Sequence, residues 1–439
     1  MLNPERERVG PPLVFESTAE AAPATLSLDS EIRVDVAIVG GGLTGISTAL
    51  HLAKENVVVA VLEAKSIGWG ASGRAFGGVV PALRKGPEAV IQHYGSAHGE
   101  RILETVGRGA DLVYGLITQY DIGCAPVRTG IITAAHSANG RRRLDKQAEY
   151  WAGRGAPVAI MEGSAAQQLL GTAFYQSCFI DYRGGSINPL GYVRGLARAA
   201  IAAGAKVYTQ TPVRRLQQCS TGWELPTDRG LVKASRVVLA TDGYTDNLFP
   251  GLSKTYVAMR GNLIVSKPLA HHARNSILPG GQTMMDTRRL YSGVRMLPDG
   301  RMQVGANGSL FGSETSPDLQ EARRRVLRLF PQLDDIEWEE SWSGIVGYAP
   351  SGLPHIHELA PGLFTGVGFS GRGLVVATLF GRELAIRSRN GDVRECAFPV
   401  MPMRKVTMHS LAPLGALPLV WGKRILDMID DRRFAADRK

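Results

Sequence analysis

A glycine-rich turn between an apolar strand and a helix constrains this chain more than any other feature of its sequence. Residues 34–39, VDVAIV, predict a buried strand, and residues 40–45 then carry three glycines in the spacing GxGxxG. Gly40 allows a tight turn, Gly42 lets the backbone approach a diphosphate, and Gly45 lets the following helix pack on the strand. The N-terminus of that helix offers unpaired N–H groups to an anion. The pattern predicts a dinucleotide-binding βαβ unit.

A second apolar strand follows the helix and ends on an acidic residue. Residues 57–62, VVVAVL, are rich in β-branched side chains, and Glu63 comes directly after them. A carboxylate at this place accepts hydrogen bonds from ribose hydroxyls and repels a 2′-phosphate. Strand, glycines, helix, strand and acid therefore occur in the complete order, which is far more specific than a lone GxGxxG.

Signals of a nucleotide-binding domain recur at the beginning, in the middle and near the end of the 439-residue chain. A chain of this length exceeds one compact core, and segments with the pattern of antiparallel meanders fill the gaps between these signals. We expect an α/β fold (α+β overall) with a discontinuous Rossmann-type domain and an inserted antiparallel-sheet substrate domain. The expected boundaries are 1–95, 184–254 and 340–439 for the nucleotide domain, and 96–183 and 255–339 for the substrate domain.

Composition excludes several other functions. The chain has 50 Lys and Arg against 40 Asp and Glu, but the basic residues are scattered or share helices with acids, which argues against a nucleic-acid partner. The four cysteines lie far apart, and His355 and His357 lack a nearby third ligand, so we expect no metal. Without a signal-peptide pattern or an apolar run of membrane-spanning length, we expect a cytoplasmic protein.

Two further glycine-rich segments point to a larger ligand than a nicotinamide dinucleotide. Residues 64–78, AKSIGWGASGRAFGG, have little packing value, so they favour close backbone approach to a bound molecule over a flexible loop. Residues 366–373, GVGFSGRG, repeat this composition just before a helix. The positive end of that helix would stabilise negative charge on the pyrimidine edge of a reduced flavin.

From about Asp35 to Asn390 the chain resembles the FAD-dependent D-amino-acid oxidase/sarcosine oxidase family. The resemblance is carried by DVAIVGGGLTG, VLEAKSIGWGASGRAFGG, VVLATDGYTDNL, LPDGRMQVGA and GFSGRG. The GASGRxxGG and GFSGRG segments, with residues 276–295, are most similar to the branch that holds γ-glutamylputrescine oxidases and bacterial L-pipecolate oxidases.

The resemblance implies a set of FAD contacts along the whole chain. The first glycines would hold the diphosphate, Glu63 the adenosine ribose, Val213 the adenine, and the last glycine-rich loop the pyrimidine end of the flavin. The full expected set is Gly40, Gly42, Leu43, Thr44, Gly45, Glu63, Ala64, Lys65, Gly70, Ala71, Ser72, Gly73, Arg74, Gly77, Gly78, Val213, Thr241, Gly243, Gly371, Arg372, Gly373 and Leu374.

Two departures from the family pattern bear on chemistry. Monomeric sarcosine oxidases attach their flavin through a cysteine near residues 341–354, where this chain has none, so we expect non-covalent FAD. Glycine and D-amino-acid oxidases place a carboxylate-binding arginine near Val346, and sarcosine oxidases place a lysine at Val375. A simple α-amino acid is therefore disfavoured, unless another arginine replaces these anchors. The candidate replacements are Arg260, Arg288 and Arg295.

Oxidation of a C–N bond needs an aromatic enclosure with a few polar groups more than it needs acid–base machinery. The candidate catalytic residues are Tyr291, Trp342 and Tyr348, flanked by Arg295 and Arg372. Each aromatic residue has plain core packing as its alternative role. We expect oxidation of a γ-glutamylputrescine-like amine to an imine by hydride transfer to flavin. The alternatives are L-pipecolate or another secondary amino acid as substrate, or a non-catalytic FAD-bound partner.

The sequence leaves two alternatives for the electron acceptor, and each implies a different role for the C-terminal segment. Either dioxygen or a respiratory quinone would reoxidise the flavin. The segment 411–430, LAPLGALPLVWGKRILDMID, either docks on a membrane to reach a quinone or forms a closing helix on the nucleotide domain. Pro413 and Pro418 interrupt a long amphipathic helix, which favours packing, so membrane association is the second interpretation.

Overall fold

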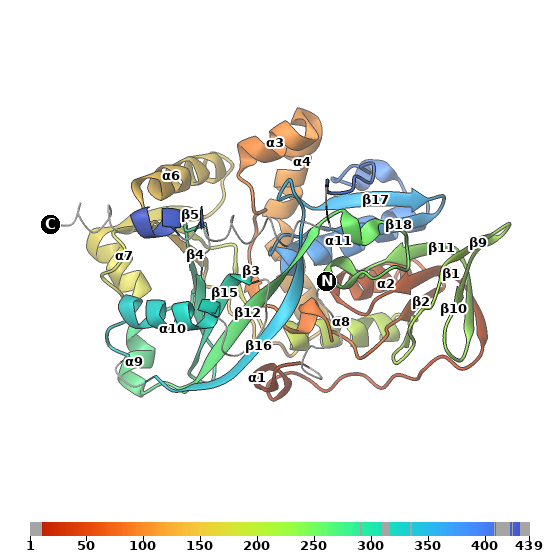
Figure 1. Ribbon diagram of the computed structural model, residues 1–439, viewed down its shortest axis with the longest axis horizontal. Coiled ribbons are helices and arrows are strands. Elements are labelled where there is room, and N and C mark those ends of the chain that lie inside the picture. The colour runs from red at the N-terminus through yellow and green to blue at the C-terminus, as the bar shows by residue number, and fades with distance from the viewer. Residues whose placement is uncertain are drawn as a thin grey trace.

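The computed structural model describes residues 11–289, 292–309, 317–333, 336–407, 409, 422–423 and 425–430. Two large sheets lie side by side along the longest axis of the molecule, each with its own helices (Figure 1). We call them the nucleotide sheet and the substrate sheet. Among the described residues, none of the helices is both long and apolar enough to cross a lipid bilayer.

The nucleotide sheet is mainly parallel, with the strand order β17-β18-β11-β1-β2-β8. Only β17 and the β9–β10 hairpin on β11 run antiparallel. Its strands are β1 (Glu31–Val39), β2 (Val59–Leu62), β8 (Lys206–Tyr208), β9 (Gln217–Cys219), β10 (Gly222–Pro226), β11 (Leu231–Leu239), β17 (His355–Ala360) and β18 (Leu363–Val367). The four residues of β2 are all buried, as expected of a parallel strand covered on both faces.

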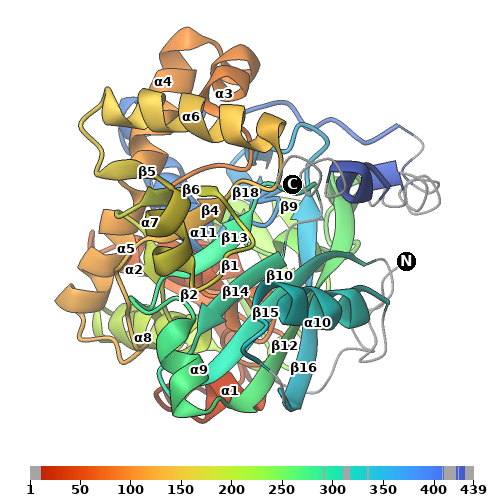
Figure 2. The ribbon, with the colours of Figure 1, turned by 90° about the vertical axis from the view of Figure 1, so that its left-hand side faces the viewer.

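The substrate sheet is antiparallel except where β13 pairs with β4, and its order is β16-β12-β15-β14-β13-β4-β6-β5. Its strands are β4 (Ile131–Ala134), β5 (Val158–Glu162), β6 (Ser177–Asp181), β12 (Val257–Pro268), β13 (Thr283–Asp286), β14 (Ser292–Met296), β15 (Arg301–Ser309) and β16 (Trp338–Tyr348). The helices gathered around it are α6 (Ala138–Ala152), α7 (Gly163–Leu170), α9 (His271–Ser276) and α10 (Pro317–Leu329), which Figure 2 shows from that side.

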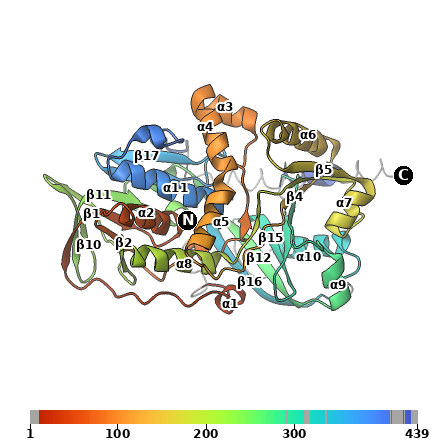
Figure 3. The ribbon, with the colours of Figure 1, turned by 180° about the vertical axis from the view of Figure 1, so that it is seen from behind.

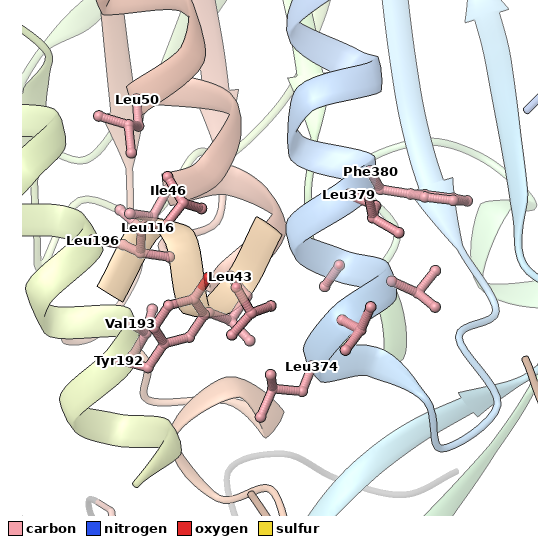
Figure 4. Close-up of a cluster of buried hydrophobic side chains, with 14 of the residues drawn as sticks. Leu43, Ile46, Leu50, Leu116, Tyr192, Val193, Leu196, Leu374, Leu379 and Phe380 are labelled. Carbon is pink, nitrogen blue, oxygen red and sulfur yellow. The ribbon is translucent and has the colours of Figure 1, made fainter. Parts of the chain in front are cut away.

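Three helices form the core beneath the nucleotide sheet: α2 (Leu43–Ala53), α8 (Pro189–Ala202) and α11 (Gly373–Ser388). Figure 4 shows α2 between the other two, with the labelled side chains Leu43, Ile46, Leu50, Leu116, Tyr192, Val193, Leu196, Leu374, Leu379 and Phe380. At Gly381 an added Cβ would overlap the Ser47 side chain, so glycine lets α11 approach α2 closely. Ser47 Oγ joins the two helices by donating to Thr378 O at 2.9 Å. This core fixes both helix N-termini that face the cavity described below.

The remaining elements lie outside the two sheets and the helices given above. They are α1 (Leu13–Glu16), α3 (Pro87–Tyr94), α4 (Ser96–Gly107), α5 (Gly109–Gln119), the two-stranded ladder of β3 (Gly78–Val79) with β7 (Gly185–Ser186), and the 3₁₀ turns Ala71–Gly73, Asp242–Tyr244, Leu252–Lys254 and Val393–Glu395. Figure 3 shows α3, α4 and α5 standing between the two sheets.

The fold class expected from the sequence is confirmed, with a Rossmann-type parallel sheet and a separate antiparallel sheet. The exact domain division stays a proposal. The expected boundary at residue 340 falls inside β16, which hydrogen-bonds to β12 in the substrate sheet. Helices α4 and α5, expected in the substrate domain, place Ile102 and Val113 in the same core cluster as α2 and α11.

Candidate active site

A cavity of about 880 Å³ lies between the two sheets, at the carboxyl ends of β1, β2 and β11. Open α/β sheets bind their ligands at this edge, because the loops that leave parallel strands converge there. The opposite wall of the cavity comes from β12, β15 and β16 of the substrate sheet. The cavity therefore joins a nucleotide-binding edge to a wall from the second sheet.

Each glycine of the first turn has a steric reason to be glycine. Gly40 has φ +110°, and an added Cβ would lie 2.8 Å from the Ala240 carbonyl oxygen. At Gly45 a Cβ would overlap the carbonyl oxygen of Gly40, where the start of α2 packs on the turn. At Gly42 it would come within 2.9 Å of the Ser72 hydroxyl, which itself accepts a hydrogen bond from Leu43 N. The turn is thus packed on every side except that of the cavity.

Glu63 is held rigidly at the cavity wall by backbone donors. Its Oε2 accepts from Gly41 N at 2.6 Å, and its Oε1 accepts from Lys65 N at 2.7 Å. Burial raises the pKa of this carboxyl, and the two N–H donors oppose that shift. Its position at the end of β2 fits a carboxylate that accepts from the hydroxyls of an adenosine ribose.

The loop over residues 68–78 is held between the two halves of the protein. Gly77 has φ +85°, and its carbonyl oxygen accepts from Ile187 N at 2.9 Å. The neighbouring Phe76 ring lies on the substrate sheet, where an added Cβ on Gly293 or Gly305 would come within 2.9 or 3.3 Å of it. Sequence reasoning missed this contact. The only sequence feature that pointed to it was the presence of Gly293 and Gly305 inside strands, because such glycines often mark a close approach.

Asp242 connects three segments at the cavity and was also missed by the sequence. Its Oδ1 accepts from Gly368 N at 2.8 Å, and the N–H groups of Gly243 and Gly347 also bond to this carboxyl. Burial raises its pKa to about 6, while these three donors oppose the shift. The sequence feature that could have indicated it is its position between Thr241 and Gly243, both of which are predicted FAD contacts.

The last glycine-rich loop aims a helix at the cavity. Gly371 has φ +84°, and α11 begins at Gly373 without a side-chain cap on its first N–H groups. Uncapped N–H groups at a helix N-terminus attract negative charge. The residues present therefore fit FAD, because the N-termini of both α2 and α11 line the cavity.

The structure brings the predicted cofactor residues together. All of them line the cavity except Gly45 and Gly73. Gly45 packs beneath the first turn, and Gly73 packs against Leu190, where an added Cβ would lie 2.9 Å from Leu190 Cδ1. Both omitted residues therefore shape the binding loops from behind. Their individual contacts to FAD stay predictions.

The five predicted catalytic residues do not gather around the cavity. Arg372 lines it, with both Nη atoms 3.5 Å from Met285 Sδ. Tyr291 lies outside the described residues. Trp342 is buried away from the cavity, where its Nε1 donates to Arg74 O at 2.9 Å. The remaining aromatic residue, Tyr348, carries the Arg84 guanidinium over its ring rather than lining the cavity.

The three arginines considered as carboxylate anchors have other partners. Arg288 forms a buried ion pair with Asp286 and donates to the Tyr175 hydroxyl at 3.0 Å. Arg260 donates to Ser343 Oγ at 3.1 Å. None of the three side chains is part of the cavity wall.

Arg295, the third of them, is a buried cation behind the wall. It donates from Nε to Gln303 Oε1 at 2.8 Å and from Nη1 to Ile187 O at 2.9 Å, whereas Nη2 has no hydrogen-bond partner among the residues that the structure describes. Burial lowers its pKa to about 9. No carboxylate among the described residues forms an ion pair with it. Its Nη atoms lie 2.7 Å from the place of an added Cβ on Gly77, so Arg295 puts positive charge next to the loop that would hold the flavin.

Replacing Arg295 by methionine is expected to make the two-electron midpoint potential of the bound flavin more negative. The variant removes a poorly solvated positive charge that favours the anionic reduced flavin. We expect a change on the order of 30 mV, which corresponds to ~1.4 kcal/mol for a two-electron couple. Arg295→Lys keeps the charge and serves as the control in a spectrophotometric redox titration. Equal potentials in the methionine variant and the wild type would contradict this role.

Three histidines meet beside the nucleotide sheet. His93 Nε2 lies 3.1 Å from His355 Nε2, so one ring donates and the other accepts. The His357 ring stacks on His355, and its Nδ1 donates to Met401 O at 2.7 Å. Burial is the main cause that lowers the pKa of His355 to about 4, and the charges of the other two histidines add to it. The folded protein therefore favours neutral rings here.

We expect acid to destabilise the folded state through His355. Its pKa falls from 6.5 to about 4 on folding, so between these values the unfolded chain binds more protons. This contribution to the free energy of unfolding is fully present above pH 6.5 and disappears as the pH falls to about 4. His355→Gln should lose ~3 kcal/mol of that pH dependence in urea titrations. The exposed His271→Gln is the matched control, and identical profiles for both variants would refute the prediction.

Residues 35–387 match the family described as FAD dependent oxidoreductase (DAO), and the chain belongs to this family. It is similar to the gamma-glutamylputrescine oxidoreductase of Escherichia coli (strain K12), with 29% identity over 379 residues, which cover 86% of this chain and 88% of that protein. The protein is thus a flavoprotein oxidoreductase, and FAD is its cofactor.

Solved structures support the fold. Glycine oxidase from Geobacillus kaustophilus superposes with a TM-score of 0.69 at 24% identity, covering 85% of this chain and 98% of that structure. L-proline dehydrogenase from P. horikoshii gives a TM-score of 0.70 at 18% identity, covering 82% and 96%. At these identities the likeness shows the fold alone.

Proposed function

We propose that this protein oxidises the C–N bond of an aliphatic amine of the γ-glutamylputrescine type to an imine, which then hydrolyses. The observation that carries the proposal is the apolar wall at Val346, where a carboxylate-binding arginine of amino-acid oxidases would stand. Val346 lines the cavity together with Leu263, Ile345 and Phe369. Such a wall suits a methylene chain beside a neutral amine and offers no charge to an α-carboxylate that lies against Val346.

The chain's own residues would orient the amine and exclude water. Leu263 and Ile345 offer apolar surface to the methylene groups, and Arg372 offers a guanidinium to a carboxylate remote from the reacting carbon. The bound FAD supplies the acceptor of the hydride. Because the step depends on placing the C–H bond correctly, positioning contributes more than proton transfer.

Two observations support non-covalent attachment of FAD. The segment 341–354 contains no cysteine. None of the four cysteines of the chain lines the cavity. Precipitating the protein with acid should therefore release all of the flavin into the supernatant.

A secondary amino acid such as L-pipecolate is the second candidate substrate, because Arg372 is a cation at the cavity to which an α-carboxylate could bind. The two candidates are separated by kcat/KM values for γ-glutamylputrescine, putrescine, sarcosine and L-pipecolate. We expect kcat/KM for γ-glutamylputrescine to exceed the other values by about tenfold or more, equal to ~1.4 kcal/mol of transition-state stabilisation. A higher kcat/KM for L-pipecolate would assign the enzyme to secondary amino acids instead. A flavoprotein that oxidises none of the four would favour a non-catalytic FAD-bound partner.

The electron acceptor is proposed to be dioxygen or a respiratory quinone. A quinone requires the protein to reach a membrane surface, whereas dioxygen does not. Assays with hydrogen peroxide detection and with a soluble quinone analogue distinguish the two. The cytoplasmic location expected from the sequence stays a prediction.

A further inference from the structure

Gln303 stands where a counter-ion of the buried Arg295 would be expected. The two residues lie opposite each other on β14 and β15, neighbouring strands of the substrate sheet (Figure 2). Arg295 is 3% exposed and Gln303 is 0% exposed. Gln303 Oε1 accepts a hydrogen bond from Arg295 Nε at 2.8 Å. The side chain that meets this buried cation is therefore a neutral amide.

Another arginine of the chain shows the complete form of such a contact. Arg183 donates from Nε to Asp181 Oδ1 at 2.9 Å and from Nη2 to Asp181 Oδ2 at 2.6 Å. This bidentate pair satisfies two parallel N–H groups and balances the charge. At Arg295 the Nε bond is present, but Nη2 and Gln303 Nε2 have no hydrogen-bond partner among the described residues. An amide has one acceptor oxygen where a carboxylate has two, so it leaves the second N–H group without an acceptor.

The other groups around Arg295 do not balance its charge. Its Nη1 donates to the neutral Ile187 O at 2.9 Å, and its Cζ lies 5.8 and 5.6 Å from the ring centroids of Phe15 and Phe76. Tyr114 is the one titratable group among the described residues whose charge acts on it. Burial raises the pKa of this phenol, so it stays neutral near neutral pH. The guanidinium is thus a buried cation among neutral groups.

We propose that Gln303 is a positioning residue for the redox chemistry of the flavin, because its amide holds the Arg295 guanidinium in place without cancelling its charge. A glutamate of the same shape would complete the bidentate pair, and an unpaired buried cation is costly. The amide is therefore the less stable choice, which makes sense where the charge itself is needed. Arg295 lies against Gly77 of the cavity wall, where positive charge favours the anionic reduced form of bound FAD. Because the effect acts on the flavin itself, it goes beyond the proposed function and holds for any amine substrate.

The test is a comparison of Gln303→Glu with the wild type, both as full-length holoproteins. The variant should make reduction of the flavin about tenfold less favourable, which moves the two-electron midpoint potential ~30 mV to more negative values. It should also raise the melting temperature by about 2 °C or more, because the new carboxylate pairs with a buried cation. A residue that only packs would not lower the potential while it stabilises the protein. Redox titration and thermal unfolding measure the two effects.

Two control variants separate charge from shape. Gln303→Met has a similar volume and no charge, so it should keep the wild-type midpoint potential while the lost hydrogen bond lowers the melting temperature. Asp181→Asn makes the reverse exchange at the Arg183 pair, which is not part of the cavity wall. It should lower the melting temperature without moving the potential. Flavin content after gel filtration shows that each variant is compared as the holoprotein.

An unchanged potential in Gln303→Glu would overturn the proposal, as would equal shifts in Gln303→Glu and Gln303→Met. A glutamate variant that is less stable than the wild type, or that fails to fold, would also contradict it, because the bidentate pair would then not form. The redox titration uses no amine, so these outcomes are independent of the proposed substrate.

Discussion

Replacing Gly45 by alanine is expected to abolish FAD binding. The new Cβ would overlap the carbonyl oxygen of Gly40, so either α2 or the diphosphate turn must move. A turn displaced by even a fraction of an ångström no longer presents its N–H groups to a diphosphate. We expect at least a hundredfold loss of FAD affinity, equal to ~2.8 kcal/mol, and a loss of 1–3 kcal/mol (roughly the usual cost of overpacking) in the free energy of unfolding.

The matched control is Gly115→Ala, because Gly115 is exposed on α5 and nothing lies within 4 Å of an added Cβ. That substitution should keep FAD and stabilise the protein by ~1 kcal/mol through helix propensity. Flavin absorbance after gel filtration and urea titration of both variants provide the measurement. If the Gly45 variant retained FAD with wild-type affinity, the assignment of the first turn to the diphosphate would be wrong.

Replacing Arg372 by methionine is expected to weaken the binding of only those substrates that carry a remote carboxylate. Arg372 is the one predicted catalytic residue among those described that lines the cavity, and its guanidinium lies against Met285. Loss of a charge-assisted contact should raise KM for γ-glutamylputrescine by ten- to a hundredfold, equal to ~1.4–2.8 kcal/mol. Putrescine lacks the γ-glutamyl carboxylate, so its kcat/KM should change little.

Flavin content must be measured with the same samples, because Arg372 is also a predicted FAD contact. Arg214→Met is a suitable control, since Arg214 lines the cavity and is ion-paired to Asp228 on the surface. Equal losses for γ-glutamylputrescine and putrescine at full flavin content would show that Arg372 does not bind a carboxylate. Loss of flavin would instead place its main role at the cofactor.

The nucleotide-binding half was predictable from sequence because its determinants are local. The turn at Gly40 and Gly45, the strand ending on Glu63 and the loop at Gly371 each act within a few residues of chain. Their glycines are required by positive φ angles or close approaches, which leave a direct signature in the sequence. The same holds for the parallel strands, whose continuous apolar runs reflect burial on both faces.

The substrate half was less predictable because its contacts join distant segments. Phe76 packs on Gly293 and Gly305, more than two hundred residues away in the chain. Strand periodicity tells which residues share a face but not where along the strand a cavity ends, so Trp342 was expected in the cavity although it packs beyond it.

Polar partners and exposed apolar faces are equally hidden from sequence. Arg288 looked like a free carboxylate anchor, yet Asp286, two residues before it, is its ion-pair partner. The apolar C-terminal segment suggested packing, but its acids turn inward to Arg289 because that arginine and His136 offer charge partners. Such pairings depend on the tertiary arrangement, which a single sequence does not display.

The most direct test of the account is an anaerobic titration of the purified yellow holoprotein with γ-glutamylputrescine, followed through the visible flavin band. The account predicts that one equivalent of amine bleaches the band and that the oxidised product is an imine or the aldehyde derived from it. Admitting air or a quinone analogue should then restore the colour. If dithionite reduced the flavin but neither this amine nor sarcosine, putrescine or L-pipecolate did so, oxidation of a C–N bond in this cavity would be contradicted.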